Sequence, residues 1–136
     1  MSVHVQVVIV DEACLSRNVL LKALGSWGYD CRTADTEASA WAALQDAQKP
    51  VILIAHWYAA FVECESFFQK IRRTSFACPV YPVAAISRNV SGSIRRCING
   101  GAADFVSRPY DLDEIRVRLH VAPALFETRV PRLSFS

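Results

Sequence analysis

Two acidic side chains and one imidazole come directly after two apolar runs of the chain. Asp11 and Glu12 follow the run 4–10, and His56 follows the run 51–55. Two carboxylates and one histidine that meet at one point suit Fe, Mn or Zn. A histidine beside a carboxylate can instead sense pH, or it can be a polar filler without chemistry. The fold that positions these three residues decides among the interpretations.

Strand-like and helix-like segments alternate along the chain. The expected strands are 4–10, 29–34, 51–55, 83–86 and 104–106, where Pro82 places the start of the fourth strand at Val83. The expected helices are 15–27, 36–47, 63–74, 90–99 and 111–121, the last one ended by Pro123. This alternation predicts an α/β fold, a flavodoxin-like (βα)5 doubly wound parallel sheet of order 2-1-3-4-5. Its site would lie at the carboxyl ends of strands one and three, where Asp11, Glu12 and His56 converge.

Length and composition indicate one folded domain. The chain has 136 residues, 52% of them hydrophobic, and its net charge of +2 is too small to indicate nucleic-acid binding. No apolar run is long enough to span a membrane, and no signal peptide is visible at residues 1–4. Five widely spaced cysteines without a C-x-x-C pattern favour a reduced, cytoplasmic protein. We expect a domain over residues 1–121 and a tail or linker over 122–136.

Several motifs in order support a specific resemblance. Residues 7–12 end in the acidic pair, residues 82–87 end in a hydroxyl, and residues 101–110 read GAADFVSRPY, close to the pattern G-A-x-D-[YF]-x-x-K-P-[FY]. Leu15-Ser16-Arg17 and Trp27-Gly28-Tyr29 add a first helix and its exit. Together these motifs make residues 4–121 resemble the CheY-like receiver domain of two-component response regulators, of an atypical kind that lacks the phosphoaccepting aspartate.

The resemblance implies roles for the polar residues at the sheet edge. Asp11 and Glu12 match the acidic pair that holds Mg²⁺ in the family, and His56 stands where the family has its phosphoaccepting aspartate. Ser87 matches the hydroxyl residue that bonds the phosphoryl oxygens. Because His56 has no carboxylate, the resemblance implies a pocket with one acidic group fewer than usual.

Three further positions follow from the same resemblance. Phe105 matches the aromatic residue that rotates on activation, and Arg108 stands in place of the family's lysine. Pro109 matches a proline whose preceding peptide bond is typically cis. An arginine fork can bind Asp11 or Glu12 through two hydrogen bonds and fill the site internally. We therefore expect weak or no Mg²⁺ binding, no other cofactor, and no aspartyl phosphate at position 56.

The leading hypothesis is a pseudo-receiver, a signalling domain without enzymatic activity that binds a protein partner or a second copy of itself. The resemblance suggests the face formed by the fourth helix, fifth strand and fifth helix, and an output domain beyond the C-terminus. One alternative is a phosphorelay receiver that uses His56 or Ser87 as its acceptor. Another is a small metal-dependent enzyme using Asp11, Glu12 and His56. Cys14, near the start of the first helix, can carry a lowered pKa there or be an inert thiol.

Overall fold

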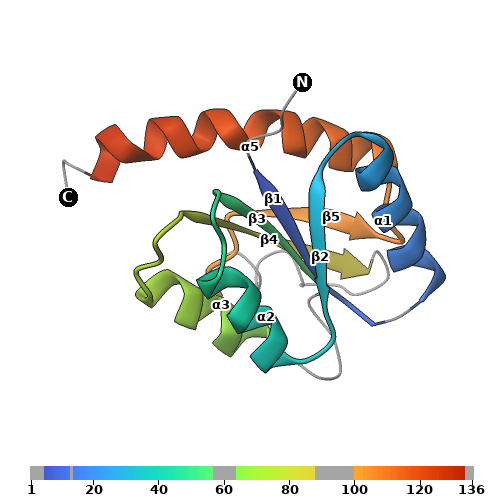
Figure 1. Cartoon of the computed structure of the whole chain (residues 1–136), viewed down its shortest axis with the longest axis horizontal. Helices are drawn as coiled ribbons and strands as arrows, with labels where there is room; N and C mark the ends of the chain where they lie inside the picture. Colours follow the sequence, from blue (N-terminus) through green and yellow to red (C-terminus); the bar gives the residue numbers. More distant parts are fainter. Residues whose placement is uncertain (1–4, 13, 57–63, 88–99, 134–136) are drawn as a thin grey trace.

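A five-stranded parallel sheet of order β2-β1-β3-β4-β5 forms the centre of the molecule (Figure 1). The computed structural model describes residues 5–12, 14–56, 64–87 and 100–133. Its strands are β1 (Gln6–Val10), β2 (Asp30–Ala34), β3 (Val51–His56), β4 (Val80–Ser87) and β5 (Asp104–Arg108). Its helices are α1 (Leu15–Ser26), α2 (Glu37–Gln45), α3 (Cys64–Arg73) and α5 (Leu112–Leu133). The predicted fold class and strand order are confirmed, whereas the helix expected over 90–99 lies outside the described residues.

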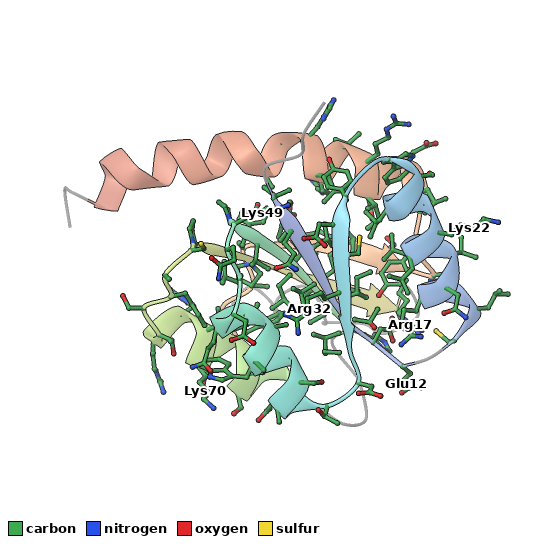
Figure 2. All side chains as sticks on the ribbon, in the orientation of Figure 1. Glu12, Arg17, Lys22, Arg32, Lys49 and Lys70 are labelled. Atoms are coloured by element: carbon green, nitrogen blue, oxygen red, sulfur yellow. The ribbon has the colours of Figure 1, made fainter. Side chains whose placement is uncertain are left out.

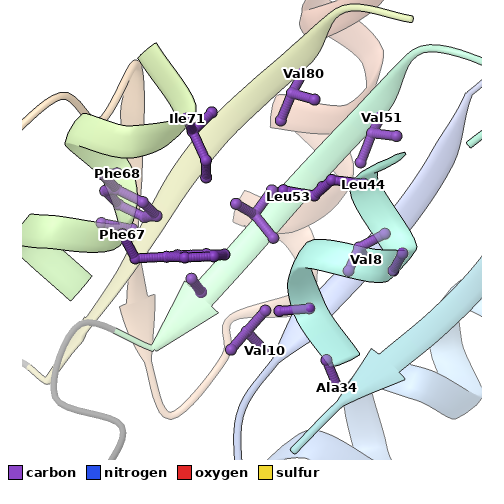
Figure 3. Close-up of a cluster of buried hydrophobic side chains, with 14 of the residues drawn as sticks. Val8, Val10, Ala34, Leu44, Val51, Leu53, Phe67, Phe68, Ile71 and Val80 are labelled. Carbon is purple, nitrogen blue, oxygen red and sulfur yellow. The ribbon is translucent and has the colours of Figure 1, made fainter. Parts of the chain in front are cut away.

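Each face of the sheet carries its own apolar core because successive strand residues point to opposite sides. Val8, Leu53 and their neighbours pack with α2 and α3, including Phe67 and Phe68 (Figure 3). On the opposite face, Ile9 and other strand residues pack against α1 and α5. The central strands β1 and β3 are buried along their whole length. This double burial explains why their sequences read as continuous apolar runs.

Local signals fix the ends of the first two helices. Gly28 adopts a φ of +88° just after α1, a backbone conformation that residues with a Cβ rarely adopt. Thr36 caps α2: its side chain accepts from the Ser39 N–H, and the Ser39 hydroxyl accepts from the Thr36 N–H. The helix then ends at Gln45, two residues earlier than expected.

The prediction that β4 starts only at Val83 is wrong. The strand begins at Val80, and Pro82 lies inside it, opposite Leu53 of β3. The carbonyl of Pro82 accepts from the Ala103 N–H at 2.8 Å, so its nitrogen also faces the β5 side of the strand. Since β5 begins only at Asp104, opposite Val83, the missing N–H falls just before the β4–β5 ladder. The proline therefore costs β4 no hydrogen bond within that ladder.

The last strand and the last helix are both longer than the sequence pattern indicated. β5 runs to Arg108 and not only to Val106. The expectation that the last helix ends at Val121 is wrong, because α5 continues through Pro123 to Leu133. A proline removes one hydrogen bond of the helix, and the good helix formers that follow it, such as Ala124 and Leu125, allow the helix to continue. In the described part of the chain, no helix has both the length and the apolar character needed to cross a membrane.

Candidate functional site

The carboxyl ends of β1 and β3 bring Asp11 and His56 together. These strands are adjacent and parallel, with Val10 opposite Ala55, so the residues that follow reach the same edge of the sheet. The Nδ1 atom of His56 lies 3.4 Å from Oδ1 of Asp11. Both residues are buried, with Asp11 fully inaccessible and His56 only 8% exposed. This is the edge at which the doubly wound topology predicted a site.

Arg108 reaches this edge from the end of β5 and forms a fork with Asp11. Its Nε donates to Oδ2 of Asp11 at 3.0 Å, and its Nη2 donates to Oδ1 at 3.3 Å. The expected arginine fork is thus observed, on Asp11 and not on Glu12. Two charge-assisted hydrogen bonds in this geometry are stronger than the single contact a lysine would make.

Two further donors complete the surroundings of Asp11. The hydroxyl of Tyr110 donates to Oδ2 at 2.7 Å, and the backbone N–H of Glu12 donates to Oδ1 at 2.7 Å. Each carboxylate oxygen therefore accepts at least two hydrogen bonds. The role of Tyr110 was missed by the sequence analysis. The only signal for it in the sequence is that Tyr110 is the aromatic residue that ends the motif 101–110.

The hydrogen bonds determine the charge state of Asp11. Burial on its own would raise the pKa of this carboxyl, because water no longer solvates the charge. The hydrogen bonds from His56, Arg108, Tyr110 and the Glu12 backbone lower it by more, so that the pKa of Asp11 lies well below its usual range. Asp11 is consequently a carboxylate at any physiological pH.

The pKa values of the two donors Arg108 and Tyr110 are raised, whereas that of Asp11 is lowered. Burial would lower the pKa of the Arg108 guanidinium, but its hydrogen bond and charge interaction with Asp11 raise it above the usual value. Burial raises the pKa of the Tyr110 phenol, and the nearby Asp11 charge raises it further. Both groups therefore keep their protons, and Asp11 remains saturated with donors.

The start of α1 contacts the same cluster. Nη2 of Arg108 lies 3.4 Å from Sγ of Cys14, and the backbone N–H of Tyr110 is 3.5 Å from the Ser16 hydroxyl oxygen. The peptide bond between Arg108 and Pro109 is cis. Cys14, the residue just before α1, thus lies beside the guanidinium of Arg108. The motifs in the sequence did not indicate this contact.

The side chains of the remaining predicted site residues lie around this cluster without a hydrogen bond to Asp11 among the contacts described above. Glu12 has an exposed side chain at the end of β1 (Figure 2). Ser87 is half-buried at the end of β4, opposite Arg108 in the strand register. Phe105 is half-buried and packs against the core on the α2–α3 side of the sheet. The structure therefore brings Asp11, His56 and Arg108 into contact and leaves Glu12 at the surface.

The geometry limits what the cluster can bind. Among the described residues, no three His, Cys, Asp or Glu side chains are placed so that they could hold a metal ion together. The carboxylate most suited to a cation, Asp11, already binds the guanidinium of Arg108. A cation at this carboxylate would have to displace that guanidinium.

Comparison with curated proteins finds a sensor kinase. The chain matches no protein-family model. It is 27% identical over 115 residues to the sensor histidine kinase RcsC of Salmonella typhi, and 27% identical over 113 residues to RcsC of Escherichia coli K12. These matches cover 85% and 83% of this chain. The chain spans only 12% of the length of either kinase.

Solved structures of receiver domains share the fold. The signal receiver domain of an HD domain-containing protein from Pseudomonas fluorescens superposes with a TM-score of 0.79 at 16% identity, covering 97% of this chain and 96% of that one. The chemotaxis response regulator CheY4 of Vibrio cholerae gives 0.70 at 19% identity, covering 86% and 99%. A third match is a chain of the co-crystal structure of Saccharomyces cerevisiae Ypd1 with the receiver domain of Ssk1. It has a TM-score of 0.70 at 12% identity, covering 88% of each chain. The chain therefore has the flavodoxin-like fold that these CheY-like receiver domains share.

Proposed function

We propose that this chain is a pseudo-receiver, a signalling domain that acts through protein–protein contacts without aspartyl phosphorylation. The observation that carries the proposal is the Arg108–Asp11 fork beside His56. This arrangement bears on the two chemical requirements of a receiver, a carboxylate nucleophile and a bound dication.

The first requirement concerns the nucleophile. Position 56 carries an imidazole at the end of β3, and the buried carboxylate 3.4 Å from it belongs to Asp11, just after the neighbouring strand β1. That carboxylate accepts hydrogen bonds on both of its oxygens, so its lone pairs are engaged. A nucleophile held in this way would have to lose donors before it could attack a phosphoryl donor.

The second requirement concerns the cation. Mg²⁺ prefers oxygen ligands in octahedral geometry, and the Asp11 oxygens are the only fully buried carboxylate oxygens of the described residues at this edge. The guanidinium of Arg108 supplies positive charge there in place of a metal ion. The residues present therefore do not fit a magnesium site of the receiver type.

A signalling role follows from the fold and from the relatives. Receiver-domain neighbours indicate a signalling domain more than an enzyme, and the Ypd1–Ssk1 structure shows a receiver domain with a histidine phosphotransfer protein. For this chain we propose a protein partner in the cytoplasm, either a kinase-related protein or a second copy. Because α5 continues to Leu133, we also propose that it leads towards an output domain.

A phosphodonor assay tests the proposal. The purified chain is incubated with acetyl phosphate, with and without Mg²⁺, and its intact mass is measured. No stoichiometric phosphoryl gain is expected, and isothermal titration should detect little Mg²⁺ binding. A Mg²⁺-dependent phosphoryl group mapped to Asp11 would contradict the proposal. A phosphoryl group mapped to His56 or Ser87 would instead support a phosphorelay receiver with an unusual acceptor.

A further inference from the structure

Two aromatic side chains reach the surface between α2 and α3. Trp41 of α2 is half-buried, and its ring centroid lies 5.3 Å from that of Phe76, which is also half-buried, and 6.2 Å from that of the buried Phe67. The ammonium of Lys70 lies 4.5 Å from the centre of the Trp41 ring. Trp41 and Phe76 rest on the core on this side of the sheet. Aromatic residues that stay partly exposed are enriched at protein–protein interfaces.

Exposed side chains of both helices surround the two rings. On α2 they lie away from its buried residues, and on α3 they share one side through spacings of three and four residues. Figure 1 shows α2 and α3 next to each other, and both pack on the face of the sheet that α1 and α5 do not cover. We call these residues, together with Trp41 and Phe76, the α2–α3 surface: Ala38, Ala42, Gln45, Asp46, Ser66, Lys70 and Arg73.

Charges of opposite sign occupy the two halves of this surface at one end. Both helices connect one parallel strand to the next, so both run back against the strands and end at the edge opposite to Asp11. Asp46 caps α2 there, whereas Lys70 and Arg73 lie in the last turn of α3. Asp46 stands at the negative end of the α2 dipole, where a cation nearby is stabilising. Between described side chains, neither Asp46 nor Arg73 forms an ion pair.

We propose that the α2–α3 surface pairs with the same surface of a second copy, with α2 of each copy against α3 of the other. In a twofold pair every contact between two different residues occurs twice. The twofold axis runs along the boundary between the helices, so that Trp41 of both copies lies near it. The helices of the two copies are then parallel, and Asp46 of each copy meets Arg73 of the other. This inference rests on the proposed function and names a partner of the pseudo-receiver.

The distribution of charge favours a second copy as the occupant. A strongly acidic partner would meet Asp46, and a strongly basic one would meet Lys70 and Arg73. A surface whose acidic and basic halves are separate complements itself in a twofold pair. The short side chains of Ala38 and Ala42 do not hold a second helix away.

The same charges disfavour the other twofold arrangement. With the axis across the helices, α2 would lie antiparallel on α2 of the second copy. Asp46 at the end of one helix would then approach Glu37 in the first turn of the other. Like charges brought together in this way are destabilising. The contact of α2 with α3 is therefore the arrangement that the chain selects.

Sedimentation velocity over a range of protein concentrations tests the pairing. The ion pairs at the end of the surface are exposed and contribute little, so we expect a weak dimer whose population rises with concentration. Ala42→Arg should abolish it, because Ala42 is exposed in the monomer and covered in the dimer. Ser26→Arg is the matched control, since Ser26 is a small exposed residue of α1 on the opposite face. A wild-type chain that stays monomeric at every concentration, or a dimer that persists in Ala42→Arg, would overturn the inference.

Mixing two charge variants tests the arrangement. Asp46→Arg places arginine against Arg73 of the second copy, and Arg73→Asp places aspartate against Asp46. Each variant alone should dimerise about tenfold more weakly than the wild type, because two like-charge pairs replace two ion pairs. An equimolar mixture should recover the dimer, since both contacts then join opposite charges. Lys22→Glu on α1, shown away from Lys70 in Figure 2, should change neither result.

A mixture that stays as weak as the separate variants would exclude the contact of α2 with α3. The phosphodonor assay reports on the Asp11 edge of the sheet, whereas the surface charges lie at the opposite edge. Failure of the pairing is therefore distinguishable from failure of the pseudo-receiver proposal.

Discussion

Arg108 and Asp11 are 97 positions apart in the sequence, and Nε of Arg108 lies 3.0 Å from Oδ2 of Asp11. The contact joins the end of β5 to the end of β1, across β3 and β4. Tyr110, two residues after Arg108, donates to the same carboxylate. The connection between β5 and α5 is therefore held at the edge of the sheet by one buried carboxylate.

Removal of the Asp11 charge should destabilise the protein strongly. Asp11→Asn leaves the guanidinium of Arg108 without its ion pair in a site where Arg108 is only 20% exposed. The expected loss in the free energy of unfolding is about 3 kcal/mol, measured by urea denaturation. Asp30→Asn is the control, because the Asp30–Lys49 pair is exposed and its loss should cost at most about 0.5 kcal/mol.

A double-mutant cycle isolates the Asp11–Arg108 pair. Arg108→Met alone should also be destabilising, since it leaves a buried carboxylate with fewer donors. The double variant Asp11→Asn with Arg108→Met should lose less than the sum of the two single losses. Strict additivity would show that the two side chains do not stabilise each other.

Stability should fall in acid because of Asp11. The pKa of this carboxyl is lower in the folded protein than its usual value of about 4. The stabilisation is therefore fully present above that value and is lost progressively as the pH falls below about 4. Urea denaturation at a series of pH values should show this slope, and Asp11→Asn should flatten it. An equal acid slope in Asp11→Asn and in the exposed control Glu12→Gln would contradict the assignment.

The Tyr110 hydroxyl should contribute to stability through Asp11. Tyr110→Phe removes the 2.7 Å hydrogen bond and keeps the ring that packs against the α1–α5 side of the core. A loss of about 1–2 kcal/mol is expected, because the acceptor is charged. The pKa of Asp11 should also rise in this variant, which carboxyl-selective NMR can follow through a pH titration. Unchanged stability and an unchanged Asp11 titration would show that the hydroxyl is dispensable.

If the proposed function is right, phosphoryl transfer at this edge should require two changes. His56→Asp places a carboxylate at the end of β3, but the Arg108 fork still occupies Asp11. The double variant His56→Asp with Arg108→Lys replaces the fork by a single ammonium contact. We expect clear Mg²⁺-dependent phosphoryl gain from acetyl phosphate only in the double variant, measured by intact mass. Equal phosphorylation of His56→Asp alone would show that the fork does not block the site.

Two glycines should respond in opposite ways to alanine. Gly101 has a φ of +107°, and a Cβ there would lie 2.6 Å from Cδ of Arg72 and 3.3 Å from the Phe68 carbonyl oxygen. Gly101→Ala should therefore cost about 2 kcal/mol in the free energy of unfolding. Gly25 lies inside α1 with open space around it, so Gly25→Ala should stabilise by about 0.5–1 kcal/mol. Equal effects in thermal denaturation would contradict the assigned backbone roles.

Much of the fold was readable from local patterns. The runs that became β1 and β3 are apolar throughout because both faces of these strands are buried. Thr36 and Gly28 mark helix ends through short-range hydrogen bonds and backbone conformation. The strand order then placed Asp11 and His56 at one edge, since parallel strands end on the same side.

Other features depended on neighbours distant in the sequence. Pro82 is tolerated inside β4 because β5 starts one residue further on, which no local rule reveals. Helix α5 passes Pro123, although the proline predicted its end. The fork fell on Asp11 because that side chain is buried beneath the end of β1, whereas Glu12 points to the surface.

Residue types alone indicated that position 56 carries no carboxylate and that position 108 carries an arginine, because both are covalent facts of the chain. The saturation of Asp11 by Arg108, Tyr110 and the Glu12 N–H depended on folding. Hydrogen bonds require donors and acceptors within about 3 Å, and only packing of β1 against the β5–α5 connection achieves that separation. The imidazole at position 56 was thus visible in the linear order of residues, whereas the donors that surround Asp11 were decided by contacts between residues distant in the sequence.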